Sequence, residues 1–391
     1  QMCVAKKRGA NFDPENRSPA TVVVSDGVHP QIIDVIKTRL DPLGAKVVVV
    51  NTVAQCEAEM TKPGFSGVIA AYPTTLGQVD DYTSLAQRVK AAGGLFVVDA
   101  DLLSLAILKE PAKFGADVCV GTSGRFGLPM GYGGGHAAFL STTEELKRAM
   151  PGRIIGVSKD AAGDVAYRLA LQTREQHIKR EKASSNLCTA SALMAQVAAF
   201  YAMWHGPAGI KAIAEAIHNK AETLRSGVRR LGFQALEGPI FDTVVIRLPS
   251  SSTARAIHER AKAKGFNFRQ LDGNRIGITL DETTTHRDVC DILRAFANKE
   301  KLPFKCSELA FTPLPETITR KTPYLTHPLF NTHHSETGMM RYLFNLQTKD
   351  IGLNSRMVPL GSCTMKLNPA AAMAPILWPE FANIHPFAPA D

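Results

Sequence analysis

A glycine-rich turn that follows a short apolar strand has the composition of a ligand site. The stretch GTSGRFGLPMGYGGGHAAFL, residues 121–140, begins where the strand ADVCVG ends. An upstream strand, LFVVDAD, ends in Asp99 and Asp101. Carboxylates and a polar turn at strand ends suit the binding of a cofactor. Yet the turn contains no lysine, no carboxylate and no group of metal ligands. Its glycines are concentrated at four positions: Gly131, Gly133, Gly134 and Gly135.

A second candidate site is the segment GSCTMKLN, bounded by Gly361 and Pro369. It places hydroxyl, thiol, ammonium and amide groups within a few residues. Lys366 or a backbone N–H group could bind a carboxylate or a phosphate oxygen. The alternative is a polar loop whose side chains satisfy one another. The candidate pocket-lining residues are Ser362, Cys363, Thr364, Lys366 and Asn368.

The basic stretch TREQHIKREKASSNLCT, residues 173–189, is the third candidate. Its cationic side chains suit an anionic ligand or an interface, and its hydroxyl and amide groups could cap a helix that starts near Thr189 and bind phosphate there. Plain capping and interface salt bridges are the alternative. The residues concerned are Arg174, His177, Lys179, Arg180, Ser185, Asn186 and Thr189.

One cysteine and three histidines are weaker candidates for a chemical role. Cys188 lies near the expected helix N-terminus, where a thiolate is favoured, so a redox role competes with that of a buried structural cysteine. His333 and His334 are adjacent, but no further ligands accompany them, so capping or interface roles are favoured and no metal site is predicted. His136 either reaches an interface or satisfies the glycine-rich turn.

The elements that must position these residues alternate between strands and helices. Apolar strands are expected at TVVVS, AKVVVV, SGVIAAYP, LFVVDAD and ADVCVG. Helices are expected between them, at PQIIDVIKTRLDPLG, DDYTSLAQRVKAAGG and LLSLAIL. Continuous apolar strands separated by amphipathic helices predict a mostly parallel sheet flanked by helices on both faces. Ligands of such sheets bind at the carboxyl ends of the strands, where Asp99, Asp101 and the turn after Gly121 lie.

The rest of the chain predicts further units. Helices at 189–204 and 207–231 lead to the strand TVVIRLP, a helix at 253–264, short strands around FNFRQLDGNRIGITL and a helix at 285–298. The stretch after this last helix is rich in proline, which is typical of a linker. The predicted division is a large α/β domain over 1–205, a small α+β domain over 206–299, a linker over 300–322 and a new segment over 323–391.

Composition narrows the function classes. The chain has 391 residues and a formal net charge of +9, and 45% of its residues are hydrophobic. Nucleic-acid or anionic-membrane binding is one option for a basic protein, but the charges are dispersed and no nucleic-acid motif is present. No apolar run approaches the ~18 residues needed to span a bilayer. Seven scattered cysteines without CxxC spacing argue against a disulfide scaffold or zinc site and for a reducing compartment.

The order of these units resembles a fold-type I enzyme dependent on pyridoxal 5'-phosphate (PLP). A Rossmann dehydrogenase competes, but no G-x-G-x-x-G opens a helix after the first strand. Long strings are more specific and resemble the P protein of the glycine cleavage system, the PLP-dependent glycine dehydrogenase (decarboxylating), over essentially the whole chain. They are RFGLPMGYGGGHAAF, MPGRIIGVSKDAAG, ALQTREQHIKREKASSNLCTA, LTHPLFNTHHSET, MVPLGSCTMKLNP and FANIHPFAP.

The resemblance implies two related halves, fused in some organisms and separate subunits in others. Only the second half has the Schiff-base lysine, and its equivalent here falls near Gly124. The chain then corresponds to the lysine-free first half plus the start of the second, with the lysine beyond Asp391. In fold-type I enzymes an aspartate pairs with the pyridine nitrogen, and Asp99 takes that place here. Without a nearby lysine we expect Asp99 to be vestigial or structural, and Asp101 to cap the next helix.

The resemblance also implies the reaction and the partners. Glycine is decarboxylated on PLP, and the aminomethyl group passes to the lipoyl group of the H protein. The partners are then the remaining half or a sister subunit, the lipoylated H protein and other glycine cleavage components, in a dimer of paired halves without nucleic acid or membrane. The compartment is the mitochondrial matrix in a eukaryote and otherwise the cytoplasm.

Three other hypotheses stay open. This half could be purely structural, holding the sister half or the H protein without lining the pocket. The chain could act alone as a PLP enzyme through another lysine, such as Lys366. It could instead bind nucleic acid.

Overall fold

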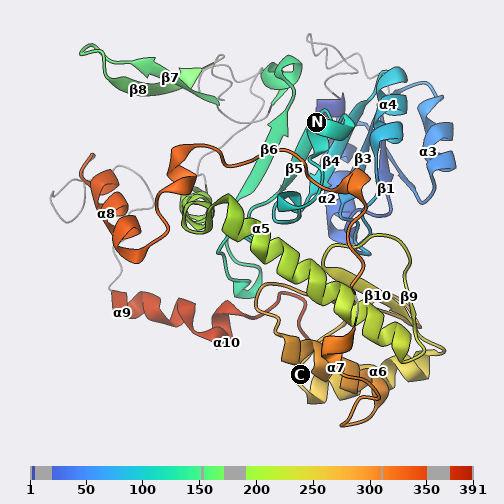
Figure 1. Ribbon diagram of the computed structural model, residues 1–391. Coiled ribbons are helices and arrows are strands. Elements are labelled where there is room, and N and C mark those ends of the chain that lie inside the picture. Colours follow the sequence, from blue (N-terminus) through green and yellow to red (C-terminus); the bar gives the residue numbers. More distant parts are fainter. Residues whose placement is uncertain are drawn as a thin grey trace.

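A six-stranded sheet forms the centre of the larger unit (Figure 1). The computed structural model describes residues 2–4, 20–150, 154–170, 191–309, 311–349 and 370–389. The strand order is β2-β1-β3-β4-β5-β6, in which the first five are parallel and β6 runs antiparallel to β5. The predicted mostly parallel sheet is therefore confirmed. The strands are β1 Thr21–Ser25, β2 Lys46–Val50, β3 Phe65–Tyr72, β4 Leu95–Ala100, β5 Val118–Thr122 and β6 Ala138–Thr142.

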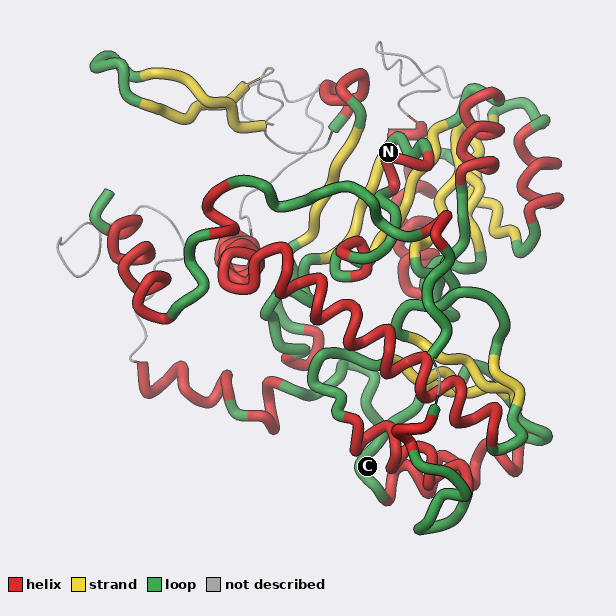
Figure 2. The backbone as a smooth tube through the Cα atoms, in the orientation of Figure 1, coloured by secondary structure: helices red, strands yellow, loops and turns green. Residues whose placement is uncertain are grey.

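Helices cover both faces of this sheet, as the continuous apolar strands predicted (Figure 2). Side chains alternate along a strand, so Val23 faces one layer while Val22 and Val24 face the other. Val22 and Val24 pack with α2 Pro30–Leu40. Val23 belongs to the core that α3, α4 and the first part of α5 complete. These helices are α3 Val53–Met60, α4 Thr83–Ala91 and α5 Ala192–Arg230.

The helix expected at LLSLAIL is wrong: only a short 3-10 helix, η2 Ser104–Ala106, forms there. The hydroxyl of Ser104 donates to the carbonyl of Asp101, and Leu108 forms a bridge with Thr319. Leu103 and Leu108 are both fully buried. An apolar segment buried on several sides does not need the single apolar face of an amphipathic helix, so the periodicity was misleading.

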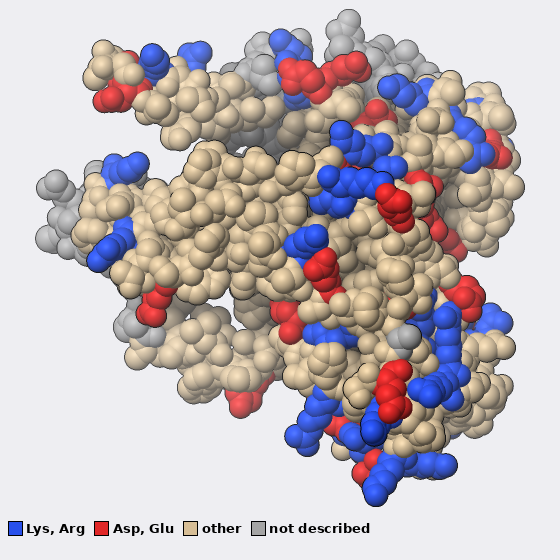
Figure 3. All heavy atoms as spheres, in the orientation of Figure 1, with Lys and Arg blue, Asp and Glu red and all other residues tan. Residues whose placement is uncertain are grey.

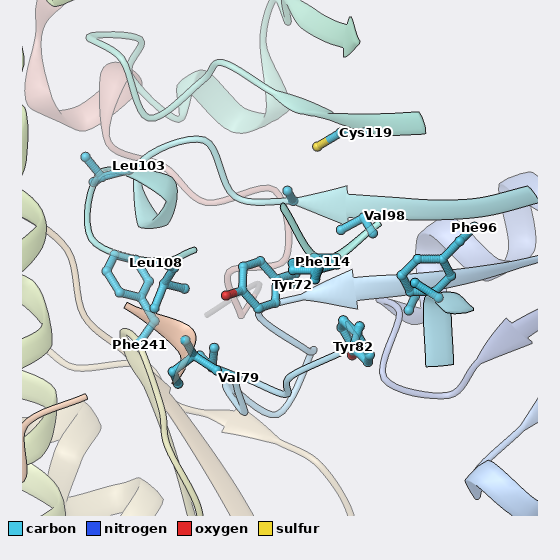
Figure 4. Packing of buried hydrophobic residues seen from close by; sticks show 14 of the residues in the cluster. Tyr72, Val79, Tyr82, Phe96, Val98, Leu103, Leu108, Phe114, Cys119 and Phe241 are labelled. Carbon is cyan, nitrogen blue, oxygen red and sulfur yellow. The ribbon is translucent and has the colours of Figure 1, made fainter. Parts of the chain in front are cut away.

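An aromatic cluster fills the core on the α4 side of the sheet (Figure 4). Phe96 on β4 has no exposed surface and meets Tyr82 and Phe114 edge to face, with ring centroids 5.7 and 6.4 Å apart. Tyr72 on β3 packs against Phe114 in the same way at 5.3 Å. Such edge-to-face pairs stabilise beyond their buried area.

The long helix α5 leads from the large sheet to the small unit. It bends at Gly206, whose φ of 62° is left-handed, and Pro207 follows directly. A Cβ atom at position 206 would lie 2.7 Å from His334 and 2.9 Å from the carbonyl oxygen of Phe330, so the bend needs glycine. The helices predicted at 189–204 and 207–231 are thus two arms of one bent element.

A smaller antiparallel sheet forms the second unit, in the order β11-β12-β10-β9. Its strands pair in register, for example Val245 with Gly277. Thr285 and Asp288 form a capping box at the start of α7. The elements are β9 Gln234–Ala235, β10 Thr243–Arg247, β11 Arg269–Gln270, β12 Arg275–Thr279, α6 Ser251–Ala263 and α7 His286–Ala297.

Further elements project beside the large sheet or come after the small one. A two-stranded hairpin comprises β7 Ile154–Lys159 and β8 Val165–Ala170, and the later helices are α8 Glu336–Gln347, α9 Ala370–Met373 and α10 Pro379–Ala382. The remaining 3-10 helices are η1 Asp41–Leu43, η3 Pro111–Phe114, η4 Gly131–Gly133, η5 Glu144–Ala149, η7 Cys306–Glu308, η8 Glu316–Ile318, η9 Pro328–Asn331 and η10 Ala374–Leu377. No described helix is both long and apolar enough to cross a bilayer.

The predicted segment boundaries can be placed on this structure. The boundary at 205/206 coincides with the bend of α5, and the four-part division stays a prediction. A disulfide between Cys290 on α7 and Cys306 on η7 joins the small unit to the next segment, with Cα atoms 6.2 Å apart. The cysteine spacing gave no sign of this pair, because it forms only when the chain folds back across 16 residues.

Replacing Phe96 should test the aromatic core. Phe96→Ala removes a fully buried ring and leaves a cavity among the neighbouring rings, so the free energy of unfolding should fall by about 3–5 kcal/mol. Urea unfolding followed by circular dichroism measures this change. Val35 on α2 is 58% exposed, so Val35→Ala should shift the value by less than about 0.5 kcal/mol. Equal effects of both substitutions would contradict the buried packing of the Phe96 ring.

Candidate functional site

The candidate site lies where β4 and β5 end, at the carboxyl edge of the large sheet. Asp99 is paired in the sheet with Ala71 and Val120, and Asp101 comes directly after β4. The turn after β5 is held by Ser123, whose N–H and hydroxyl both donate to the carbonyl of Ala137, at 2.9 and 3.1 Å. The strand-end aspartates and the turn therefore meet at one edge, as the sequence predicted.

An arginine of this turn forms the central interaction of the site. Arg125 Nη1 lies 2.7 Å from Asp101 Oδ2 and 2.5 Å from Asp242 Oδ2. Its guanidinium also lies over the ring of buried Phe241, 5.6 Å from the centroid. Asp101 belongs to the large unit and Asp242 directly precedes β10 of the small one. One cation thus joins the two units at the site.

Burial and charge act against each other in this group. Burial raises the pKa of Asp101, and Arg125 opposes that rise. Burial would lower the pKa of Arg125, but the carboxylates of Asp101 and Asp242 outweigh it and raise that pKa. The guanidinium is therefore permanently charged and holds two acids in one partly buried place.

Asp99 is perturbed in a different way. Burial, together with the nearby charge of Asp101, raises its pKa to about 6. Burial and the charge of Asp99 raise the pKa of the Cys119 thiol to about 12. An acid that is half protonated near pH 6 suits either a ligand that donates to it or a purely structural position.

Two glycines of the turn differ in what they allow. A Cβ at Gly121 would lie 2.2 Å from the carbonyl oxygen of Ala100, so this strand end requires glycine. At Gly124 the nearest atom to a Cβ would be Thr122 Oγ1 at 3.4 Å. Position 124, where the resemblance to the family places the Schiff-base lysine, therefore has room for a Cβ atom. The charged side chain of the turn stands one residue later, at Arg125.

The glycine-rich part of the turn contacts a segment that is distant in the sequence. The N–H of Tyr132 donates to the carbonyl of Ile384 at 2.8 Å, and a Cβ at Gly133 would lie 3.4 Å from Pro386. Tyr132 itself is left-handed, with a φ of 52°. The segment after α10 therefore rests on this turn.

Several predicted site residues lie outside the described part of the chain. This applies to both pocket-lining candidates and to the possible redox cysteine. They are Ser362, Cys363, Thr364, Lys366 and Asn368, together with Arg174, His177, Lys179, Arg180, Ser185, Asn186, Cys188 and Thr189.

The other candidates have identifiable surroundings. Asp101 accepts a hydrogen bond from the N–H of Leu103 at 3.1 Å, but no α-helix follows, and the N-cap position of the 3-10 helix η2 is Leu103, so the predicted helix cap at Asp101 is wrong. The ring of His333 contacts that of Tyr342 in a tilted arrangement, with centroids 4.4 Å apart, and His334 donates to the carbonyl of Trp204 at 2.9 Å. His136 is exposed. Within the described ranges, no three His, Cys, Asp or Glu residues gather as metal ligands.

Sequence reasoning missed the partnership of Arg125 with Asp242. Arg125 was visible inside the turn, and Asp242 stands directly before an apolar strand. Their separation of 117 residues offered no pattern that could have joined them. An acid at the start of a strand in the small unit was the only available signal.

The fold is shared with PLP-dependent enzymes of known structure. A C-DES mutant with glycine covalently linked to its PLP cofactor superposes with a TM-score of 0.54 at 16% identity, covering 76% of this chain and 78% of that one. A sphingosine-1-phosphate lyase from Burkholderia pseudomallei superposes with a TM-score of 0.55 at 13% identity, covering 76% of this chain and 66% of that one. At such identities the likeness concerns the fold alone. The chain has the fold-type I architecture of PLP-dependent enzymes.

Closer matches define the family. Residues 11–296 match the glycine cleavage system P-protein family, and the chain belongs to it. A crystal structure of glycine decarboxylase (P-protein) in inhibitor-bound form superposes with a TM-score of 0.66 at 29% identity, covering 76% of this chain and 68% of that one.

Curated relatives are named glycine dehydrogenase (decarboxylating). The mitochondrial glycine dehydrogenase (decarboxylating) 1 of Arabidopsis thaliana is 48% identical over 95% of this chain and 36% of its own length. The enzyme of Cupriavidus metallidurans is 47% identical over 95% of this chain and 38% of its own length. The mitochondrial enzyme of Dictyostelium discoideum is 45% identical over 100% of this chain and 39% of its own length. The chain therefore spans less than two fifths of these relatives.

Removing the cation of the site should destabilise the chain. Arg125→Met leaves the carboxylates of Asp101 and Asp242 together without a counter-charge, so the free energy of unfolding at pH 7 should fall by about 3–5 kcal/mol. Adding Asp101→Asn and Asp242→Asn to that variant should recover most of the loss. Urea unfolding measures both. Arg88→Met, which breaks an exposed pair with Glu57, should cost at most about 1 kcal/mol.

The raised pKa of Asp99 predicts a pH dependence of stability. The folded chain keeps this proton up to about pH 6, whereas the unfolded chain loses it near pH 4, so the stabilisation is full below about pH 4 and is lost as the pH rises through 6. The Asp99→Asn variant has no carboxyl group to ionise at this position, so its free energy of unfolding should not fall through this pH range. The variant should match the parent near pH 4 and exceed its free energy of unfolding by up to about 3 kcal/mol at pH 8.

Urea unfolding at several pH values measures the Asp99 effect. Asp34→Asn on α2, where the carboxylate is exposed, should leave the difference between the pH values unchanged. A parent and an Asp99→Asn variant with parallel stability curves would show that burial does not raise the pKa of Asp99.

Proposed function

We propose that this chain is the lysine-free portion of a PLP-dependent glycine dehydrogenase (decarboxylating). The complete protein decarboxylates glycine and transfers the aminomethyl group to the lipoyl group of the H protein. One observation carries the proposal. The sheet edge has the strand-end aspartates and the turn of a PLP site, but the charged group beside the lysine position is Arg125, already bound by Asp101 and Asp242.

The turn does not fit a covalently bound PLP. Residues 121–128 include no lysine, and the one cation among them is engaged by two carboxylates. PLP supplies an electron sink for decarboxylation when it is bound in the complete protein. We place its Schiff-base lysine outside residues 1–391, so this chain alone is inactive.

We propose that this chain completes the active site at an interface. The candidate lining residues stand in the two segments that lie outside the described residues, GSCTMKLN and TREQHIKREKASSNLCT. Lys366 or Arg174 would bind the carboxylate of glycine or a phosphate oxygen, because each is a charged donor. Ser185, Asn186 and Thr189 would act as neutral donors. Cys188 remains a candidate for redox control.

A purely structural role is the competing proposal. The ion pairs of Arg125 support it, because Nη1 of its guanidinium is already engaged by Asp101 and Asp242 within the chain. Ser362→Ala and Arg174→Ala in the complete enzyme separate the two proposals. Normal rates and normal PLP affinity in both variants favour the structural role, whereas a lowered rate in either favours pocket lining.

The proposed partners derive from the reaction. The remaining C-terminal portion, or a sister subunit, would supply the lysine, and the lipoylated H protein would accept the aminomethyl group. We propose a dimer of paired halves. The mitochondrial names of the Arabidopsis and Dictyostelium relatives support a mitochondrial matrix location if the source is a eukaryote.

Borohydride trapping tests the position of the lysine. PLP is added to this chain alone and to the complete protein, each is reduced, and peptides are mapped by mass spectrometry. We expect no stoichiometric adduct on this chain alone and a single adduct outside residues 1–391 in the complete protein. A stoichiometric adduct on a lysine of this chain, Lys366 included, would overturn the proposal.

A further inference from the structure

The β7–β8 hairpin has one apolar face. Ile155 lies opposite Leu169, Val157 opposite Tyr167 and Lys159 opposite Val165. Since side chains alternate along each strand, these pairs share one face, and the opposite face has only smaller or polar residues near its centre, including Gly156 and Arg168. The hairpin face is defined by Ile155, Val157, Val165, Tyr167 and Leu169.

This hairpin face is open to solvent. Val157 is 75% exposed and Tyr167 is 73% exposed, and the other three are exposed as well. Figure 1 shows the hairpin projecting from the large unit, and Figure 3 shows it standing off from the body, with charged residues near its tip. Within the described ranges, neither strand packs extensively against any element except the other strand.

Such a hairpin requires a partner. An isolated two-stranded hairpin is at best marginally stable in water, and independent stability needs further strands or a packed face. Soluble proteins rarely leave several large apolar side chains together on a projecting element unless a partner covers them. The five side chains are contiguous across the two strands, so one surface can cover them all.

The character of the hairpin face favours a permanent partner. The face itself contains five apolar side chains and one charge, Lys159, and permanent interfaces are more apolar than transient ones. Other exposed apolar residues occur on elements that lie on the same side in Figure 1, such as Phe344 on α8 and Leu377 on η10. A surface of this kind suits a part of the same protein rather than a carrier that binds and leaves.

The length of the relatives indicates which part that is. This chain spans only 36–39% of the curated relatives described above, so most of a full-length polypeptide lies outside the structure. We propose that the hairpin face is a docking site for the C-terminal portion of the full-length polypeptide. The inference rests on the proposed function, because that function supplies the longer protein.

Cysteine accessibility in the full-length protein tests the inference. Val157→Cys and Tyr167→Cys are treated with iodoacetamide, and modification at the introduced site is followed by mass spectrometry. Arg168→Cys on the opposite face of β8 is the matched control. We expect labelling at positions 157 and 167 to be at least tenfold slower than at position 168. Equal rates at all three positions would overturn the proposal.

A photocrosslink identifies the occupant. Benzoylphenylalanine replaces Tyr167 in the full-length protein, and the crosslinked peptide is sequenced. A peptide from beyond the span of this chain supports the proposal. A peptide from residues 1–391 of a second copy, or from added H protein, overturns it.

The outcome is separable from that of the proposed function. Neither labelling nor crosslinking requires PLP, glycine or turnover. A full-length protein that protects position 167 but forms its PLP adduct within residues 1–391 would contradict the proposed function alone. An active enzyme that labels rapidly at all three positions would contradict the docking site alone.

Discussion

The guanidinium of Arg125 is the interaction on which the site edge depends. It meets Asp101 from the end of β4 and Asp242 from the small unit. Two carboxylates in a partly buried place would repel each other and lose their hydration, and a permanent cation bound to both offsets part of these costs. Arg125 therefore helps to place the small unit at this edge, together with Arg269, whose guanidinium donates to the carbonyl and the hydroxyl of Thr75.

The remainder of the turn has taken on a structural task as well. Its glycines let the backbone approach another segment closely, and the N–H of Tyr132 binds the carbonyl of Ile384. Glycine-rich turns at strand ends commonly receive phosphate through such N–H groups. Here one such N–H group binds the chain's own backbone.

The sequence predicted the fold well because its strongest signals were local. The run VVV in β1 is typical of a strand buried on both faces of a parallel sheet, and Val22, Val23 and Val24 are buried there. The helix predicted at LLSLAIL is wrong. Leu103 and Leu108 are buried in a core that also contains Ile318, and Leu108 forms a bridge with Thr319, so contacts far along the chain determine this segment. In the site, Asp99 and the turn could be placed from strand ends. The pairing of Arg125 with Asp242 and the exposure of the hairpin face that includes Tyr167 depend on the tertiary arrangement, which sequence periodicity does not encode.

The bond between Arg125 and Asp242 also has a consequence for synthesis on the ribosome. The two residues are 117 apart, and chains grow at about 5–20 residues per second. The strands of the large sheet emerge before Asp242 does, so the growing chain spends roughly 6–25 s with Arg125 bound by only one acid. During that interval water must occupy the place of the second carboxylate, and the edge of the large sheet stays open until the small unit emerges and closes it.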